Sequence, residues 1–329
     1  MTSTSIDVII CTYNNAAILD QTLTAIAAQT GAETVDWGVW VVDNNCTDDT
    51  TQVLEWHLKS SQIPQLRVIK ETKQGLSHAR HAGINASSRE WIAFVDDDCV
   101  LEPEWIQEAA RFASKHPACG AFGGCNKIAW EVPPTPFIQA YQTAYAAQDL
   151  GPDPIQFAPF QYPVGAGVVL RRKALLESGW NERQLLVGRE GKALSAGDDT
   201  EIAIRIQQMG YELWFTPDCV LHHQIPKRRI TDKYLISMSF GFGQADPYLR
   251  SMAWQGSYFG WLVPYLFAFL LRHAKIAIFS ILSFLGFIPK NELLIRWSII
   301  RGQWTGLKSL TWTQYDRIKN LQSANLENT

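Results

Sequence analysis

The chain has 329 residues, of which 47% are hydrophobic and 19% are charged, and it contains 13 tryptophans. This composition is typical of a globular protein that is long enough for a large core and for more than one domain. The net charge of −3 lacks the basic excess of most nucleic-acid-binding proteins, so we expect no nucleic-acid partner.

The cysteines and the amino terminus indicate the compartment. The six cysteines form neither a Cys-x-x-Cys pair nor a Cys/His cluster with zinc-binding spacing. We therefore expect reduced, mostly buried thiols in a cytosolic protein. The first apolar run has no basic segment before it and ends at Thr12-Tyr13-Asn14-Asn15, so we expect no signal peptide.

Four short apolar runs in the first 118 residues predict strands of a buried parallel sheet. The runs are 6–11, 37–42, 66–69 and 90–95. Amphipathic stretches after them predict helices, the first of which begins after Asn14 or Asn15. Strand and helix alternating at this spacing predict right-handed crossovers and a doubly wound, mostly parallel α/β sheet.

Three of these strands end in polar residues. The first ends in Thr12-Tyr13-Asn14, the second in Asp43, and the fourth in Asp96-Asp97-Asp98. Ligands bind beyond the carboxyl ends of strands in such sheets, so the three ends should line one crevice. Asp96 and Asp98 are two residues apart and can share a divalent cation, although a lone acidic triplet also fits a solvated turn.

Beyond Cys119 the regular alternation stops. Proline-rich loops are expected at 133–136 and 151–163, followed by a glycine-containing strand at 164–170. Gly197-Asp198-Asp199 opens a predicted helix that Gly210 closes. We expect Trp180 and a mobile loop at 186–196 to shape an acceptor pocket.

The last quarter of the chain is unusually apolar. The runs 258–271 and 276–288 are separated by Arg272-His273-Ala274-Lys275. Each run is shorter than the ~20 residues that span a bilayer, and one spanning helix would bury Arg272 and Lys275 at its centre. We interpret the runs as an interfacial or re-entrant helical hairpin, the alternative being a helical subdomain packed on the core.

The ordered motifs resemble glycosyltransferase family 2, whose members have the GT-A fold. The resemblance covers roughly residues 6–231. It is carried by Thr12-Tyr13-Asn14, Asp43, Gly75 with Ala79-Arg80, Phe94-Val95-Asp96-Asp97-Asp98, Gly165-Ala166-Gly167, Gly197-Asp198-Asp199, and His223 before Ile225-Pro226. Two departures are His81, where the family usually has Asn, and Asp198, where Glu is common.

The resemblance, together with the apolar last quarter, implies a domain plan. Residues 1–230 would form the GT-A domain, with a nucleotide-sugar-binding half at 1–118 and an acceptor half at 119–230. Residues 231–329 would form a helical region that associates with a membrane. The protein would then be peripheral or monotopic on the cytoplasmic face.

The implied activity is inverting transfer of a sugar from a nucleotide-diphosphate sugar to an acceptor hydroxyl. The acceptor would be a saccharide or a lipid-linked molecule, in polysaccharide, exopolysaccharide or glycolipid biosynthesis. The alternatives are a sugar nucleotidyltransferase and a catalytically degenerate nucleotide-sugar-binding protein.

The resemblance also implies roles at the donor site. Thr12, Tyr13 and Asn14 would line the base, and Asp43 would accept a hydrogen bond from it. Gly75 belongs to the same site. Arg80 would contact phosphate or orient the acidic triplet, unless it is a surface cation.

A metal and a base complete the implied site. Asp96 and Asp98 would hold Mn²⁺ or Mg²⁺ against the leaving diphosphate, and Asp97 would face the sugar or support its neighbours. His223 is a further candidate ligand, with His222 as the competing assignment and simple packing as the alternative for either.

Asp199 is the candidate general base, although Asp198 or Asp199 would also serve as a plain helix cap. Lys227-Arg228-Arg229 is a solvated cluster, a phosphate clamp or, as we prefer, a contact for anionic lipid.

Overall fold

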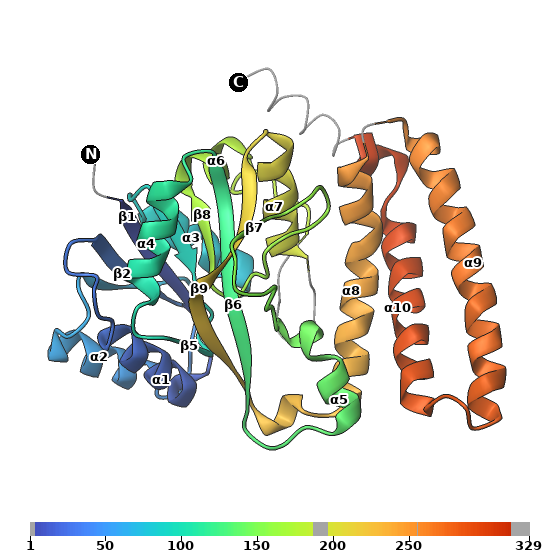
Figure 1. Ribbon diagram of the computed structural model, residues 1–329, viewed down its shortest axis with the longest axis horizontal. Helices are drawn as coiled ribbons and strands as arrows, with labels where there is room; N and C mark the ends of the chain where they lie inside the picture. The colour runs from blue at the N-terminus through green and yellow to red at the C-terminus, as the bar shows by residue number, and fades with distance from the viewer. Residues whose placement is uncertain (1–3, 187–196, 255, 317–329) are drawn as a thin grey trace.

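The computed structural model describes residues 4–186, 197–254 and 256–316. These residues form a mixed sheet with helices on both faces and, beside it, three long helices (Figure 1). We call these two parts the sheet region and the three-helix region. All six cysteines lie in the described ranges and form no disulfide with one another, and four of them are buried.

The first half of the sheet region has the predicted alternation. Its strands pair in parallel in the order β3-β2-β1-β4, and helices α1, α2 and α3 connect and flank them. The elements are β1 (Ser5–Thr12), α1 (Ala16–Ala27), β2 (Asp36–Asp43), α2 (Thr50–Ser60), β3 (Leu66–Lys70), α3 (Leu76–Ala86) and β4 (Trp91–Phe94). The buried side chains of β1 alternate between the two faces of the sheet, Ile6 and Val8 on one and Ile9 on the other.

The second half adds antiparallel pairs. Strand β8 runs antiparallel to β4 and β6, while β6 and β9 are parallel, and both β5 and β7 pair antiparallel with β9. The elements are β5 (Cys99–Leu101), α4 (Trp105–Lys115), β6 (Cys119–Trp130), α5 (Pro136–Ala140), η1 (Gln142–Tyr145), β7 (Ile155–Gln156), β8 (Val168–Arg171), α6 (Arg172–Glu177), α7 (Asp198–Gln208), β9 (Glu212–Ile225) and η2 (Lys227–Arg229). The sheet is therefore parallel in its first half and mixed in its second.

The three-helix region differs from the sequence interpretation. Its helices are α8 (Asp232–Ala253), α9 (Tyr258–Phe284) and α10 (Lys290–Ser309). The two apolar runs do not form a hairpin with each other, because Arg272-His273-Ala274-Lys275 continues the helix within α9. The chain turns instead at Gly286, which has φ +82, and at Pro289, so the hairpin is formed by α9 and α10.

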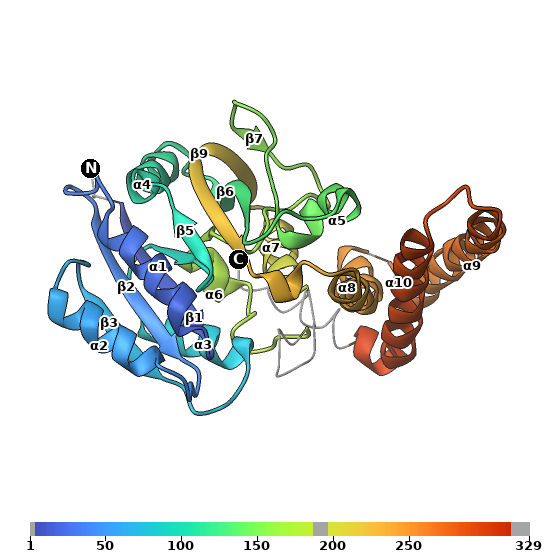
Figure 2. The same ribbon diagram turned by 90° about the horizontal axis from the view of Figure 1, so that it is seen from below.

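Close backbone contact and one partly buried carboxylate hold this region together. A side chain at Gly243, Gly302 or Gly306 would collide with a backbone carbonyl of the facing helix, so α8 and α10 need glycine where they cross. Asp246 of α8 accepts hydrogen bonds from Tyr265 of α9 (2.9 Å) and Gln303 of α10 (3.1 Å). Figures 1 and 2 both place α8 nearest the sheet region and α9 on the outside.

Candidate active site

The end of β1 holds the central residue of the acidic triplet. Thr12 Oγ1 donates to Asp97 Oδ2 (2.7 Å), and Asn15 Nδ2 donates to Asp97 Oδ1 (3.0 Å). Burial and the charge of Asp98 raise the pKa of Asp97 to about 7, against the effect of these two hydrogen bonds. Asp97 thus faces the end of β1 and the residue that precedes α1, while its predicted role, toward the sugar or as a support for its neighbours, stays a prediction. Asn15 was not among the predicted site residues.

The ends of β1 and β2 lie side by side, since Thr12 and Asp43 are register partners. Asp43 is buried, and its Oδ1 accepts the Cys46 N–H (2.8 Å). Asn14 adopts φ +51, and its Oδ1 accepts the N–H of Thr47 (2.7 Å). The residues predicted to contact the nucleotide base therefore lie along one edge of the sheet, which these hydrogen bonds hold in place. The Tyr13 side chain is half exposed to solvent.

Arg80 joins two elements that are distant in sequence. It lies on α3, which begins after Gly75, a residue with φ +135 whose N–H donates to Asn44 Oδ1 (2.8 Å). The Arg80 guanidinium is buried, forms an ion pair with Asp198 of α7 and lies over the Phe94 ring. The surface-cation alternative for Arg80 is therefore wrong.

Two carboxylates of the triplet form a potential cation site. Ligand atoms of Asp96, Asp98 and Cys99 lie within 4.8 Å of one another. Burial and the neighbouring acids raise the pKa of Cys99 well above its usual value, so this residue stays a thiol. The hard oxygen ligands are therefore those of Asp96, which is partly exposed, and of Asp98, which is buried.

His223 lies beside Asp98 because β5 pairs with β9, with Cys99 opposite His223. Its Nε2 is 3.3 Å from Asp98 Oδ1, while its Nδ1 is 2.7 Å from the carbonyl oxygen of Tyr145. Burial disfavours the imidazolium form, but Asp98 and Asp96 together raise the pKa of His223. His222 points to Glu102 instead, so of the two candidates only His223 faces the triplet.

Asp98 also has a basic partner that sequence reasoning placed elsewhere. The Arg229 guanidinium is 2.8 Å from Asp98 Oδ2, and its side chain is 19% exposed. The preferred lipid contact for the cluster 227–229 is therefore wrong for Arg229, whereas Lys227 and Arg228 are exposed. A run of three cations does not reveal which one turns inward.

The two neighbouring aspartates at the start of α7 have different surroundings. Asp198 is buried against Arg80, whereas Asp199 is partly buried, and its Oδ1 accepts the Thr200 N–H (2.8 Å). A side chain at Gly165 would collide with Asp199 Oδ2, so this glycine makes room for the carboxylate. Burial and the charge of Asp198, opposed by Arg80, raise the pKa of Asp199. Asp96 also raises the pKa of Asp199, so the carboxylates of α7 and of the acidic triplet are close enough to interact electrostatically.

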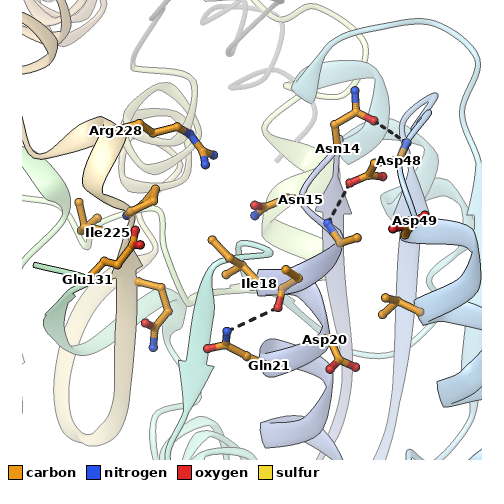
Figure 3. Close-up of a pocket in the computed structure, with 15 residues that line it drawn as sticks. Asn14, Asn15, Ile18, Asp20, Gln21, Asp48, Asp49, Glu131, Ile225 and Arg228 are labelled. Atoms are coloured by element: carbon orange, nitrogen blue, oxygen red, sulfur yellow. Dashed lines mark hydrogen bonds between the residues drawn. The ribbon is translucent and has the colours of Figure 1, made fainter.

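A groove of about 780 Å³ opens beside the triplet. Figure 3 shows Asn14, Asn15 and Asp48 on one wall, and Glu131 and Arg228 on the other. Because Asn15 also holds Asp97, this wall of the groove is joined directly to the acidic triplet.

The predicted acceptor pocket is only partly described. Residues 187–196 of the predicted loop 186–196 lie outside the described residues. Trp180 is fully buried and meets the His81 ring edge-on at 5.0 Å, so it belongs to the core and its assignment to a pocket is wrong.

The mixed sheet places its polar strand ends along one edge, as the resemblance of the sequence to the GT-A fold implies. The family model for glycosyl transferase family 2 matches residues 7–178, which is more than half of the chain. The chain therefore belongs to glycosyltransferase family 2, as its motifs predict.

Three known proteins show what the chain is similar to. Glycosyltransferase AglE of Haloferax volcanii is 34% identical over 117 residues, which are 35% of this chain and 38% of AglE. Succinoglycan biosynthesis protein ExoM of Rhizobium meliloti is 22% identical over 324 residues, 93% of each chain. Mannosyltransferase PcManGT of Pyrobaculum calidifontis, solved with GDP-Man and Mn²⁺, superposes with TM-score 0.57 and 20% identity over 93% of this chain and 88% of its own. This last likeness confirms the fold.

Proposed function

We propose that the protein is a metal-dependent, inverting glycosyltransferase that moves a sugar from a nucleotide-diphosphate sugar to an acceptor hydroxyl. The observation that carries this proposal is that two charged groups come close together beyond the carboxyl end of β4. One group contains Asp96, Asp98 and His223, and the other Arg80, Asp198 and Asp199. Membership of the family supports the proposal.

The residues present fit a divalent cation. Asp98 is buried, and its carboxylate and that of Asp96 offer the hard oxygen ligands that Mn²⁺ and Mg²⁺ prefer. Asp96 is partly exposed and can reach an incoming ion. His223 Nδ1 lies against a carbonyl oxygen, which it meets as an N–H donor, and its neutral form then presents the Nε2 lone pair toward Asp98. Mn²⁺ or Mg²⁺ bound here would neutralise the departing diphosphate.

The remaining strand ends suit the nucleotide. We assign the base to Thr12, Tyr13 and Asp43, with Asp43 accepting a hydrogen bond from a base N–H. Asn14 braces this edge through Thr47, and Gly75 lets α3 begin close to it. Arg80 orients Asp198 and adds positive charge below the triplet.

Asp199 is the proposed general base. Asp198 is occupied by Arg80, which leaves Asp199 as the carboxylate of the pair that faces Gly165. A raised pKa makes Asp199 a stronger base than an ordinary aspartate, which favours removal of a proton from an acceptor hydroxyl. With one base and a single displacement, attack from this side inverts the anomeric centre.

For the acceptor we propose a saccharide or a lipid-linked molecule, in polysaccharide or glycolipid biosynthesis. ExoM, which matches along nearly its whole length, is named for succinoglycan biosynthesis. A sugar nucleotidyltransferase is disfavoured because β1 ends at Thr12 and is followed by Tyr13-Asn14-Asn15 in place of a glycine-rich basic loop. A degenerate binding protein is disfavoured because Asp96, Asp98 and Asp199 are all in place.

The test is a thermal-shift screen of nucleotide sugars with Mn²⁺, followed by transfer and hydrolysis assays on the donor that stabilises the protein. A ligand at about 100 times its Kd adds ~2.7 kcal/mol to the free energy of unfolding. We expect one class of donor to do so, and Asp98→Ala to remove the effect. If no nucleotide sugar raises the melting temperature or is turned over, or if Asp98→Ala binds donor normally, the proposal fails.

We further propose that the three-helix region binds the cytoplasmic face of a membrane through the outer face of α9. Within the described part of the chain, α9 is the helix that is long and apolar enough to cross a bilayer. Only 11% of the most apolar stretch of α9 is buried against the rest of the protein. Large apolar side chains more than half exposed recur along it: Phe259, Val263, Phe267, Leu270, Ile278, Ile281 and Phe284.

Charge supports a helix that lies in the interface rather than one that spans the bilayer. Residues 247–291 contain Arg250, Arg272, Lys275 and Lys290 but no acidic residue, which suits anionic headgroups. Arg272 and Lys275 lie near the middle of α9, where a spanning helix would place them at the bilayer centre. Flotation of the full-length protein with vesicles tests this proposal, and recovery of all protein in the soluble fraction at low salt would refute it.

A further inference from the structure

Arg229 and a metal ion compete for the same carboxylate. The Arg229 guanidinium is 2.8 Å from Asp98 Oδ2, and the Asp98 side chain is 6% exposed. A cation on Asp98 would sit about 2.3 Å from its oxygens, hence within about 5 Å of the guanidinium. Like charges at that separation repel one another strongly in a partly buried site.

The backbone of Arg229 is anchored, so its side chain is the part that can move. The Arg229 carbonyl oxygen accepts the Tyr145 hydroxyl (3.0 Å), and the Arg229 N–H donates to the Pro226 carbonyl oxygen (2.8 Å). The turn η2 is thereby fixed next to β9 and the triplet. A guanidinium on four rotatable bonds reaches several ångströms around this point without any movement of the backbone.

A bound donor offers Arg229 a new partner. The diphosphate would lie against the metal, hence beside Asp98, and phosphate oxygens accept paired hydrogen bonds from a guanidinium. Arg228, the adjacent cation, is exposed and lines the groove, whereas Arg229 is the residue of this turn that pairs with Asp98. The chain therefore supplies a neighbouring arginine, on the same turn and with the same charge, that serves as a matched control.

We infer that Arg229 exchanges partners during the binding cycle: it neutralises Asp98 before metal and donor bind, and it moves to the donor diphosphate when they do. This inference rests on the metal and donor site proposed above. It follows that Arg229 weakens metal binding in the absence of donor and strengthens diphosphate binding once metal is present. Metal and donor are then coupled through one side chain.

The experiment compares Arg229→Gln with Arg228→Gln in the full-length protein. Mn²⁺ binding is measured without nucleotide by electron paramagnetic resonance of the free ion. We expect Arg229→Gln to bind Mn²⁺ about fivefold more tightly, because a like charge next to the ion is removed. Pyrophosphate binding is then measured by calorimetry at saturating Mn²⁺, and we expect it to weaken about tenfold, because a charge-assisted hydrogen-bond donor is lost.

The opposite signs of these two changes distinguish the inference from a general loss of structure. Arg228→Gln should change neither affinity by more than about twofold, since exposed charges interact weakly. Arg229→Lys keeps the charge without the paired donors, so Mn²⁺ binding should match wild type while pyrophosphate binding weakens; this variant decides the question if Arg229→Gln does not fold.

Changes of the same sign in both affinities, or no change in either, overturn the exchange while leaving the proposed transferase intact. If Asp98→Ala binds Mn²⁺ as wild type does, the metal site itself is wrong and the inference falls with it.

Discussion

The sheet region buries charges, whereas the three-helix region exposes apolar side chains. In the sheet region Arg80, Asp98 and Asp198 are at most 6% exposed. In the three-helix region Phe284 is 90% exposed and Phe267 is 64% exposed. Each pattern is the reverse of what folding in water favours, because buried charges and exposed aromatic rings both raise the free energy of the native state.

This difference is the one that the proposed donor site and the proposed membrane contact require. The buried charges come as matched partners, Arg80 with Asp198 and Arg229 with Asp98, so they are ready for a charged ligand. The exposed apolar side chains of α9 follow one stripe, while Trp261, Tyr265 and Phe269 pack inward. Variants that break one pattern without the other test whether the two functions are separable.

The largest expected effect is on catalysis by Asp199. Asp199→Asn keeps the shape of the side chain but removes the base, so transfer should slow by about 10³-fold. Donor binding, measured by thermal shift with Mn²⁺, should stay within about twofold because Asp199 is assigned to the acceptor.

Asp218→Asn is the matched control for Asp199→Asn. Asp218 is an exposed carboxylate of β9 that pairs with Arg111 of α4. Its substitution should leave the rate unchanged. An Asp199→Asn variant that keeps more than a tenth of wild-type activity would rule out this residue as the base.

The strand ends are predictable because buried parallel strands are continuous apolar runs that stop at polar residues. The amino-acid sequence alone therefore suffices to place Thr12, Asp43 and Asp96 on one edge of the sheet. His223 and Arg229 cannot be placed in this way, because their approach to Asp98 depends on β5. That strand has three residues and is too short to show a periodic pattern.

Local sequence patterns also mislead where a contact from a distant segment, or the backbone geometry, determines how a helix begins or ends. Helix α1 follows Asn15 as predicted, but its first N–H is accepted by Asp48 Oδ2 (3.0 Å) from the loop before α2. The charges at Arg272 and Lys275 suggest a break in the apolar sequence, although Arg and Lys are good helix formers. The turn instead lies at Gly286, where positive φ is needed.

The second expected effect is on stability, through Arg80. Arg80→Met leaves the buried Asp198 carboxylate without its counter-ion, which should lower the free energy of unfolding by about 3–5 kcal/mol. Urea denaturation measures the change. The double variant Arg80→Met with Asp198→Asn should recover most of the loss, and a single variant that loses less than about 1 kcal/mol would contradict a structural ion pair.

A third prediction separates the two faces of α9. Phe269 is 5% exposed and Phe267 is 64% exposed. Phe269→Ser should lower the free energy of unfolding by about 3 kcal/mol. Phe267→Ser should leave stability within about 0.5 kcal/mol but weaken binding to anionic vesicles about tenfold, because an apolar side chain no longer enters the lipid.

Vesicle flotation and denaturation of the same two variants provide the measurement. If Phe267→Ser binds vesicles as well as wild type does, the outer face of α9 is not the membrane contact. If Phe267→Ser also lowers the free energy of unfolding by as much as Phe269→Ser does, the exposed apolar side chains of α9 are buried in an assembly of proteins rather than in lipid.

The smallest expected effect is a shift in pH dependence. Burial and the charge of Asp198 raise the pKa of Asp199, and the base works only when it is ionised. The rate should therefore fall as pH decreases through this raised pKa, at a higher pH than an ordinary aspartate would give. Asp198→Asn removes the second of these causes, so the acidic limb of kcat/KM should move to lower pH. An acidic limb that does not move in Asp198→Asn would mean that another group, and not Asp199, controls the reaction at low pH.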